Sequence, residues 1–87
     1  MEQNACSPIL SEDVHTILIV DDDEFNRAIL NNLFSEIYAI REAENGRAGL
    51  EEILKNRDHI CAVLLDVMMP EMSGIEVLQR LKEENLL

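Results

Sequence analysis

Three aspartates stand where they could bind a metal ion together. Asp21 and Asp22 directly follow the apolar run 17–20, and Asp66 directly follows a second apolar run, 60–65. If the two runs are neighbouring strands of a parallel sheet, their carboxyl ends bring the three carboxylates close together. Anions in such proximity repel one another, so either one carboxylate keeps a proton or a cation joins them. Carboxylate oxygens with access to water favour Mg²⁺ as that cation.

The next two acids have a simpler interpretation. Asp23 and Glu24 stand at the N-terminal end of a predicted helix, 24–34, where the helix dipole favours negative charge. Helix capping would explain the preceding aspartate pair about as well as metal binding does, if that pair stood alone. The third aspartate, at the end of the second apolar run, favours a metal site.

The elements that would position these acids alternate along the chain. Short apolar runs rich in β-branched residues predict strands, and apolar residues at helical spacing predict helices between them. This order, β-α-β-α-β-α, predicts the α/β class, with a parallel sheet and right-handed crossovers. In chain order, the predicted elements are 17–20, 24–34, 38–43, 45–57, 60–65 and a last helix capped by Ser73.

Each predicted helix has an apolar face that we expect to pack on the sheet. The methionines of the loop before the last helix, at positions 68, 69 and 72, are interpreted as side chains that fill gaps in the core. The residues of the apolar faces are Phe25, Ile29 and Leu33 with Leu30 and Phe34 beside them, then Leu50, Ile53 and Leu54, then Ile75, Leu78 and Leu81.

Length and charge limit the classes of function. A chain of 87 residues, 47% hydrophobic, is long enough for one small domain. Seven Lys and Arg against 18 Asp and Glu give a formal net charge of −11, which disfavours nucleic acids and anionic membrane surfaces as direct partners. No apolar run approaches the roughly 18 residues that a membrane span needs. Cations and basic protein surfaces are the partners that this charge favours.

Residues 1–15 form a polar leader before the predicted domain, 16–87. The first four residues carry an acid and no base, and no long apolar segment follows, so we expect no secretory signal and a cytoplasmic protein. Cys6 lies in the leader and Cys61 in an apolar run. A structural disulfide between them is not expected in that compartment.

One segment makes the sequence resemble a known family. Residues 64–74 read Leu-Leu-Asp-Val-Met-Met-Pro-Glu-Met-Ser-Gly, and the motif D-x-x-M-P-x-M-S-G after an apolar strand is highly specific. Together with the run from Ile17 to Asp22, this segment resembles the receiver domain of two-component response regulators. The resemblance extends from about Thr16 to the C-terminus. It implies a doubly wound, flavodoxin-like parallel sheet with strand order 2-1-3, lacking the last two strands of the full order 2-1-3-4-5.

The resemblance also implies a function. Asp66 matches the aspartate that accepts a phosphoryl group from a sensor histidine kinase or a phosphotransfer protein. Asp22, Asp66 and the backbone carbonyl of Met68 would bind Mg²⁺ directly, and Asp21 would bind it through water. Pro70 and a glycine at position 74 would shape the adjoining loop. The chain would then act as a phosphoacceptor and not as an enzyme.

The sequence also departs from the family. It stops after the third predicted helix, so the family's Ser or Thr after strand four and its Lys after strand five have no counterpart here. We therefore expect weaker Mg²⁺ binding and slower phosphorylation than in a complete receiver. Strand 60–65 would become an apolar edge, which predicts a homodimer of this chain, formed either by antiparallel pairing of two such strands or by exchange of a helix or strand between copies. An interaction module that does not switch is the alternative function.

Other classes of site fit the sequence less well. Asp21-Asp22-Asp23 could be the D-x-D motif of a haloacid-dehalogenase-like phosphatase, but Glu24 and Phe25 follow where that family has Thr or Val and then small residues. A calcium-binding EF-hand loop would need an oxygen ligand at the position of Phe25. The two histidines, at positions 15 and 59, have no ligand partner at zinc-site spacing and are interpreted as surface residues.

Overall fold

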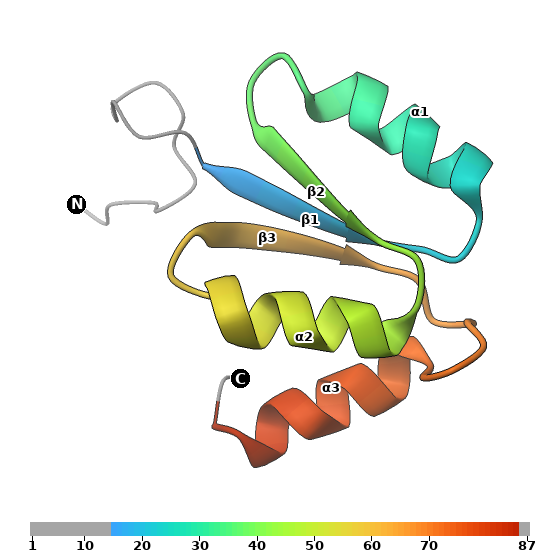
Figure 1. Ribbon diagram of the computed structural model, residues 1–87, viewed down its shortest axis with the longest axis vertical. Helices are drawn as coiled ribbons and strands as arrows, with labels where there is room; N and C mark the ends of the chain where they lie inside the picture. The colour runs from blue at the N-terminus through green and yellow to red at the C-terminus, as the bar shows by residue number, and fades with distance from the viewer. Residues whose placement is uncertain (1–14, 86–87) are drawn as a thin grey trace.

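The computed structural model describes residues 15–85, in which strands and helices alternate as predicted (Figure 1). Most of the predicted leader, including Cys6, lies outside these residues. No helix within them is long and apolar enough to cross a membrane. The elements are β1 (Thr16–Val20), α1 (Glu24–Phe34), β2 (Ala39–Ala43), α2 (Gly46–Asn56), β3 (Ile60–Leu65) and α3 (Gly74–Glu83).

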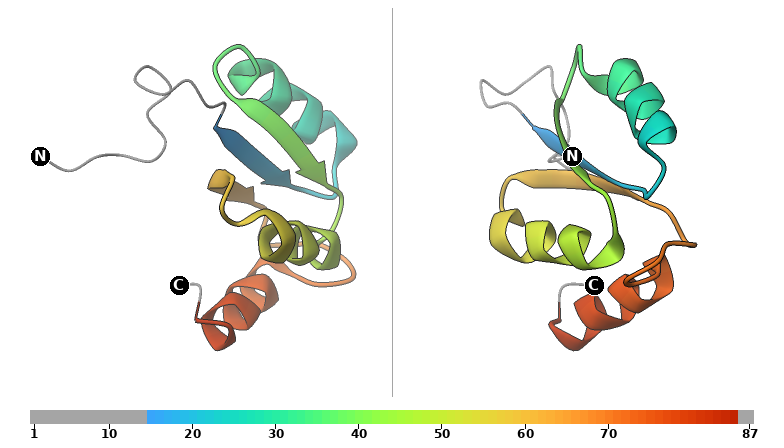
Figure 2. Two further views of the ribbon diagram at one scale, coloured as in Figure 1. Left: turned by 60° about the vertical axis from the view of Figure 1, so that its left-hand side comes forward. Right: turned by 45° about the vertical axis from the view of Figure 1, so that its right-hand side comes forward.

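The three strands form a parallel sheet in the order β2-β1-β3, which confirms the predicted fold. Central β1 pairs in register with β2 from Thr16 to Val20, whereas its pairing with β3 is irregular between Thr16 and Ile17. Helix α1 covers one face of the sheet, and α2 and α3 cover the other (Figures 1 and 2). The connection from β1 to β2 and the connection from β2 to β3 run in opposite directions across the sheet. Because both crossovers are right-handed, they place α1 and α2 on opposite faces.

Strand β1 is buried on both faces. Leu18, Ile19 and Val20 have no exposed surface, and Ile17 retains 5% of its own. A strand with helices on both sides and strands on both edges has no face in water, which explains why its apolar residues are consecutive. Every residue of β3 is only half-buried, because within residues 15–85 no strand pairs with its second edge.

The hydrophobic core lies between the sheet and helices α2 and α3. Leu18 and Val20 point to this side from β1, and Met72 joins them from the loop before α3. Met69 packs against the cluster, whereas Met68 is 80% exposed, so the interpretation of the methionines as core fillers is correct for two of the three. The core cluster is Leu18, Val20, Ala43, Leu50, Ile53, Met72, Val77 and Leu81.

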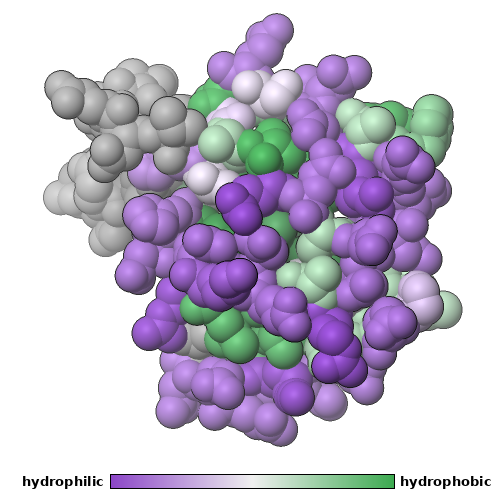
Figure 3. Space-filling model, viewed as in Figure 1, coloured by the Kyte–Doolittle hydropathy of each residue, from purple (hydrophilic) through white to green (hydrophobic). Residues whose placement is uncertain are grey.

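Helix α1 does not bury the apolar face that the sequence predicts. None of its residues is buried, and Phe25, Ile29 and Leu33 are 71%, 44% and 66% exposed. Only Leu30 and Phe34 of the predicted set are half-buried. Four-residue spacing identifies an apolar stripe along a helix, but it does not show that this stripe is the face that packs on the sheet. Hydrophobic side chains therefore show at the surface over α1, among mainly hydrophilic neighbours (Figure 3).

The two other helices need smaller corrections. In α3, Val77 and Leu81 are buried, whereas Ile75 and Leu78 are 55% and 44% exposed. In α2, two of the three predicted residues are buried and Leu54 is 41% exposed. The buried stripe of α2 is narrower than predicted, and that of α3 is shifted, because Val77 was not among the predicted residues. Residues at i and i+4 turn inward, and apolar neighbours beside them remain in water.

Candidate metal and phosphoacceptor site

Backbone hydrogen bonds bring the three aspartates to one edge of the sheet. The Asp21 N–H donates to the carbonyl of Ala43 at 3.1 Å, and the Asp66 N–H donates to the carbonyl of Val20 at 2.9 Å. Both bonds continue the ladders of β1 one residue beyond the strands. The position of the acids therefore follows from the strand pairing, as the sequence predicts.

The carboxylates of these aspartates form one cluster. Asp21, Asp22 and Asp66 each offer an oxygen, and these atoms all lie within 4.8 Å of one another. Asp22 is exposed and the other two are half-buried, so the group has access to water. Within residues 15–85, this is the one group of three or more metal-ligating side chains, and it includes neither His15 nor His59. Three hard oxygen ligands beside water suit Mg²⁺, so the residues present fit the ion that the family implies.

Short-range hydrogen bonds orient two of the carboxylates. Asp21 Oδ1 accepts the N–H of Asp23 at 2.9 Å, which tightens the turn between β1 and α1. Asp66 Oδ1 accepts the N–H of Met68 at 3.3 Å. One oxygen of each carboxylate thus contacts its own loop. This arrangement limits the rotation of both side chains before any ion or phosphoryl group binds.

Asp23 caps helix α1, as its position in the sequence predicts. Its carboxylate accepts the N–H of Phe25 at 2.9 Å, and its backbone is extended, as is typical of an N-cap. Glu24 follows in the first turn, where the helix dipole favours an acid. The four consecutive acids therefore divide into a pair that belongs to the carboxylate cluster and a pair at the N-terminal end of α1.

The loop from Asp66 to α3 is fixed at its far end. Ser73 and Glu76 form a capping box, in which the Glu76 N–H donates to Ser73 Oγ at 3.2 Å and the Ser73 N–H donates to the Glu76 carboxylate at 3.0 Å. Gly74 donates its N–H to the carbonyl of Val67 at 3.0 Å. A Cβ at Gly74 would clash with the carbonyl oxygen of Asp66, so this glycine lets α3 start directly against the aspartate.

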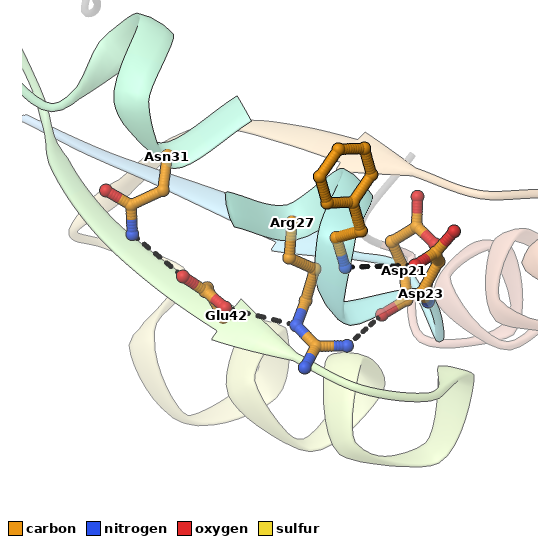
Figure 4. A network of polar contacts seen from close by, with 6 residues as sticks. Asp21, Asp23, Arg27, Asn31 and Glu42 are labelled. Atoms are coloured by element: carbon orange, nitrogen blue, oxygen red, sulfur yellow. Dashed lines mark hydrogen bonds and ion pairs between the residues drawn. The ribbon is translucent and has the colours of Figure 1, made fainter. Parts of the chain in front are cut away.

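Three residues beside the site were missed by the sequence analysis. Arg27 donates to the carbonyl of Asp21 and to the carboxylate of Glu42, and Asn31 donates to the same carboxylate (Figure 4). Arg27 and Asn31 are four residues apart on α1, so they share one face of the helix. The polar pair at this spacing, directly after the aspartates, was the available signal.

Comparison with known proteins identifies the family. The family described as "Response regulator receiver domain" matches residues 17–86. The chain is 44% identical over 73 residues to sporulation initiation phosphotransferase F of Bacillus subtilis, an alignment that covers 80% of this chain and 57% of that protein. It is also 44% identical over 68 residues to the transcriptional regulatory protein SrrA of Staphylococcus aureus, covering 77% of this chain and 27% of that protein.

A solved structure gives the same assignment. The CheX-CheY-BeF3-Mg complex of Borrelia burgdorferi matches with a TM-score of 0.76 at 33% identity, over 82% of this chain and 55% of that one. The chain thus spans little more than half the length of this structure and of the Bacillus relative. These matches favour the receiver interpretation over the haloacid-dehalogenase-like alternative. The chain belongs to the receiver domains of two-component response regulators, as a flavodoxin-like fragment with strand order 2-1-3.

Proposed function

We propose that this chain is the phosphoacceptor of a two-component system and that Asp66 receives the phosphoryl group. The observation that carries the proposal is the cluster of Asp21, Asp22 and Asp66, with ligand atoms within 4.8 Å, at the carboxyl ends of β1 and β3. Asp66 begins the loop between β3 and α3, and its Oδ1 accepts the N–H of Met68 in that loop. We further propose that the chain is modified in this reaction and is not a multi-turnover enzyme.

The residues divide the chemistry among them. Asp21, Asp22 and Asp66 would hold Mg²⁺, with the carbonyl of Met68 as a further ligand. The bound ion would neutralise the carboxylates and the incoming phosphoryl oxygens. Met68 N–H holds one oxygen of Asp66, so the second oxygen is the nucleophile. As its bond to phosphorus forms in line, the bond from phosphorus to the donor breaks and the donor keeps the electron pair.

The phosphodonor follows from the family and not from the geometry alone. A sensor histidine kinase or a phosphotransfer protein would present a phosphohistidine at this edge of the sheet, and its imidazole nitrogen would leave. The neighbouring CheX-CheY structure is a complex of two proteins and carries BeF3 and Mg, which supports a protein partner and the ion but does not identify the phosphodonor. Acetyl phosphate can replace the protein donor in a direct test.

The test uses acetyl phosphate, MgCl₂ and intact-mass analysis of the 87-residue chain. We expect one phosphoryl group on the wild type, none on Asp66→Ala, and none when EDTA removes the metal. Asp58→Ala is the matched control, because this exposed acid lies before β3 and should not change the labelling. Labelling that persists in Asp66→Ala would overturn the assignment.

A second proposal concerns self-association of this chain. The free edge of β3 adjoins an apolar groove that includes Val63, Leu65, Ile75 and Leu78. We infer that two copies pair antiparallel through β3. This pairing would place Lys55 and Arg57, which lie with Asp58 just before β3, opposite the aspartate end of the partner strand.

Sedimentation at micromolar concentration tests this pairing. We expect a dimer that dissociates on dilution, and Leu78→Lys should shift it to the monomer because Leu78 lines the groove. Leu33→Lys is the control, since Leu33 is exposed on α1, away from β3. A 9.9 kDa monomer at every concentration would contradict the proposal.

A further inference from the structure

A single side chain joins the metal-binding loop to the neighbouring strand. The guanidinium of Arg27 donates from Nη1 to the carbonyl oxygen of Asp21 at 2.6 Å and from Nε to Glu42 Oε1 at 3.0 Å (Figure 4). The Arg27 side chain is only 14% exposed, whereas that of Glu42 is 36% exposed. The contact therefore spans three elements: α1, the loop after β1, and β2.

The carboxylate that receives Arg27 is itself fixed. Asn31 Nδ2 donates to Glu42 Oε2 at 2.7 Å, so both oxygens of Glu42 accept a hydrogen bond from α1 (Figure 4). A carboxylate with both oxygens bound has little freedom to rotate. Arg27 consequently contacts an anchor that is held from two sides, on a strand that pairs directly with β1.

Asp21 is the other end of this contact, and its peptide groups have defined partners. Its N–H donates to Ala43, its carbonyl accepts from Arg27, and its carboxylate accepts from Asp23. The carbonyl of Asp21 belongs to the peptide that joins it to Asp22. The orientation of that peptide, and with it the direction of the Asp22 side chain, depends on the guanidinium.

Apolar packing restrains this part of the molecule only weakly. Helix α1 contains no buried residue, and its apolar contacts with the sheet come from half-buried side chains such as Leu30 and Phe34. The guanidinium of Arg27 is the side-chain group that joins the carbonyl of Asp21 to β2. A metal site tolerates displacements of only about 0.5 Å in its ligands.

We propose that Arg27 is a positioning residue, which sets the geometry of the Asp21–Asp22 pair for the divalent cation. This role rests on the proposed metal site. Arg27 does not touch the ion. It acts through the Asp21 carbonyl and the Glu42 anchor. Loss of such a supporting contact typically weakens metal binding by about 10-fold to 100-fold.

Lysine at position 27 separates geometry from charge. Arg27→Lys keeps the positive charge, but one ammonium cannot reproduce the planar fork that reaches both a carbonyl and a carboxylate. We expect Arg27→Lys to bind Mg²⁺ about tenfold more weakly than the wild type in a titration followed by the amide signals of Asp22 and Asp66. Glu42→Ala, which removes the anchor but leaves the arginine, should weaken binding several-fold.

Arg41→Lys is the matched control. Arg41 lies on β2 and, like Arg27, pairs with a glutamate, through Nε to Glu52 Oε1 at 2.7 Å, but this pair links β2 to α2 and involves none of the three aspartates. It should lose an ion pair of the same kind and retain wild-type Mg²⁺ affinity. Far-UV circular dichroism and urea unfolding confirm that each variant is folded at the titration temperature.

The outcomes separate this role from the proposed function. Wild-type affinity in both Arg27→Lys and Glu42→Ala would overturn the positioning role and leave the metal site standing. An equal loss in Arg27→Lys and Arg41→Lys would also overturn it, because the effect would then belong to ion pairs in general. If Arg27→Lys does not fold, Glu42→Ala decides alone. Absence of Mg²⁺ binding by the wild type would remove the proposed function and this role together.

Discussion

On the α2 and α3 face of the sheet, apolar side chains provide the packing, whereas on the α1 face polar contacts join the elements. The first face contains the whole buried core cluster, from Leu18 to Leu81. On the second face, α1 buries no residue, and Arg27 and Asn31 link it to Glu42 of β2. The two faces share one sheet, and β1 is buried by both.

The candidate site lies at the boundary between these two kinds of packing. Asp66 follows β3 and its loop ends in α3, whose Val77 is fully buried. Asp21 and Asp22 begin the loop that leads to α1. Strand pairing places all three aspartates, but the element that follows Asp66 packs in the apolar core, whereas the helix that follows the aspartate pair is joined to the sheet mainly by polar contacts. Polar contacts exposed to water open more readily than a buried core, so the aspartate pair is the part of the site that we expect to move.

The largest expected effect compares two leucines, one from each face. Leu18→Ala removes a side chain with no exposed surface and should destabilise the protein by about 2–5 kcal/mol. Leu33→Ala, on a side chain that is 66% exposed, should change the free energy of unfolding by less than about 0.5 kcal/mol. Urea unfolding measures both. A loss at Leu33 that approaches the loss at Leu18 would mean that α1 is covered in solution.

The second prediction compares two glycines on the packed face. A Cβ at Gly49 would lie 2.8 Å from both methyl groups of Val20, and one at Gly74 would clash with the Asp66 carbonyl and lie 3.0 Å from the Cα of Val67. Overpacking of this kind typically costs about 1–3 kcal/mol, so both Gly→Ala variants should lose stability.

Only one of these variants should affect the site. Gly74→Ala displaces the backbone of Asp66 and should slow labelling by acetyl phosphate, whereas Gly49→Ala presses on side-chain methyls and should leave labelling unchanged in the folded fraction. Intact-mass time courses measure the rates. Equal rates in the two variants would show that the Asp66 backbone is not set by the start of α3.

The third prediction compares the caps of α3 and α1. Ser73→Ala removes the hydroxyl of a capping box on a helix with buried residues, and we expect a loss of about 1 kcal/mol. Asp23→Ala removes a cap of similar geometry from α1. Because α1 has no buried residues, the loss should be smaller, about 0.5 kcal/mol. Urea unfolding of both variants decides between them. A larger loss at Asp23 would show that α1 is more firmly packed than its exposed stripe indicates.

The sequence predicts strands better than it predicts helix faces, and the reason is geometric. The consecutive apolar residues of β1 are typical of a strand with both faces buried, and β1 is the central strand of the sheet. The aspartates after β1 and β3 meet because parallel strands share a carboxyl edge. Each of these predictions depends on topology alone, and the order β2-β1-β3 confirms them.

Which face of a helix is buried depends on the elements that pack against it, and the spacing of apolar residues does not reveal those elements. Phe25, Ile29 and Leu33 form a regular stripe, yet the face that meets β1 and β2 holds Arg27 and Asn31 beside Leu30. A partly buried arginine is unexpected from composition, because it requires a partner that only the fold brings near. Glu42, on the neighbouring strand, is that partner, and its position 15 residues further along the chain than Arg27 conceals the pairing.

The smallest expected effect belongs to an ion pair on the packed face. Arg41 Nε donates to Glu52 Oε1 at 2.7 Å, and this hydrogen bond lowers the pKa of Glu52 from its ordinary value near 4.5 and raises that of Arg41. The Glu52 carboxylate therefore binds a proton more weakly in the folded chain than in the unfolded chain. The pair's contribution to stability is complete above the ordinary glutamate pKa and is lost as the pH falls through the lowered value. Both side chains are partly in water, so the contribution is small and decreases with salt.

We expect Glu52→Gln to be slightly less stable than the wild type at pH 7, and the difference to vanish as the pH falls below the lowered pKa. Urea unfolding at a series of pH values measures that difference, and a gap that grows toward low pH would contradict the sign. Mg²⁺ affinity should not respond at all, because this ion pair joins β2 to α2 and its hydrogen bonds involve none of the three aspartates.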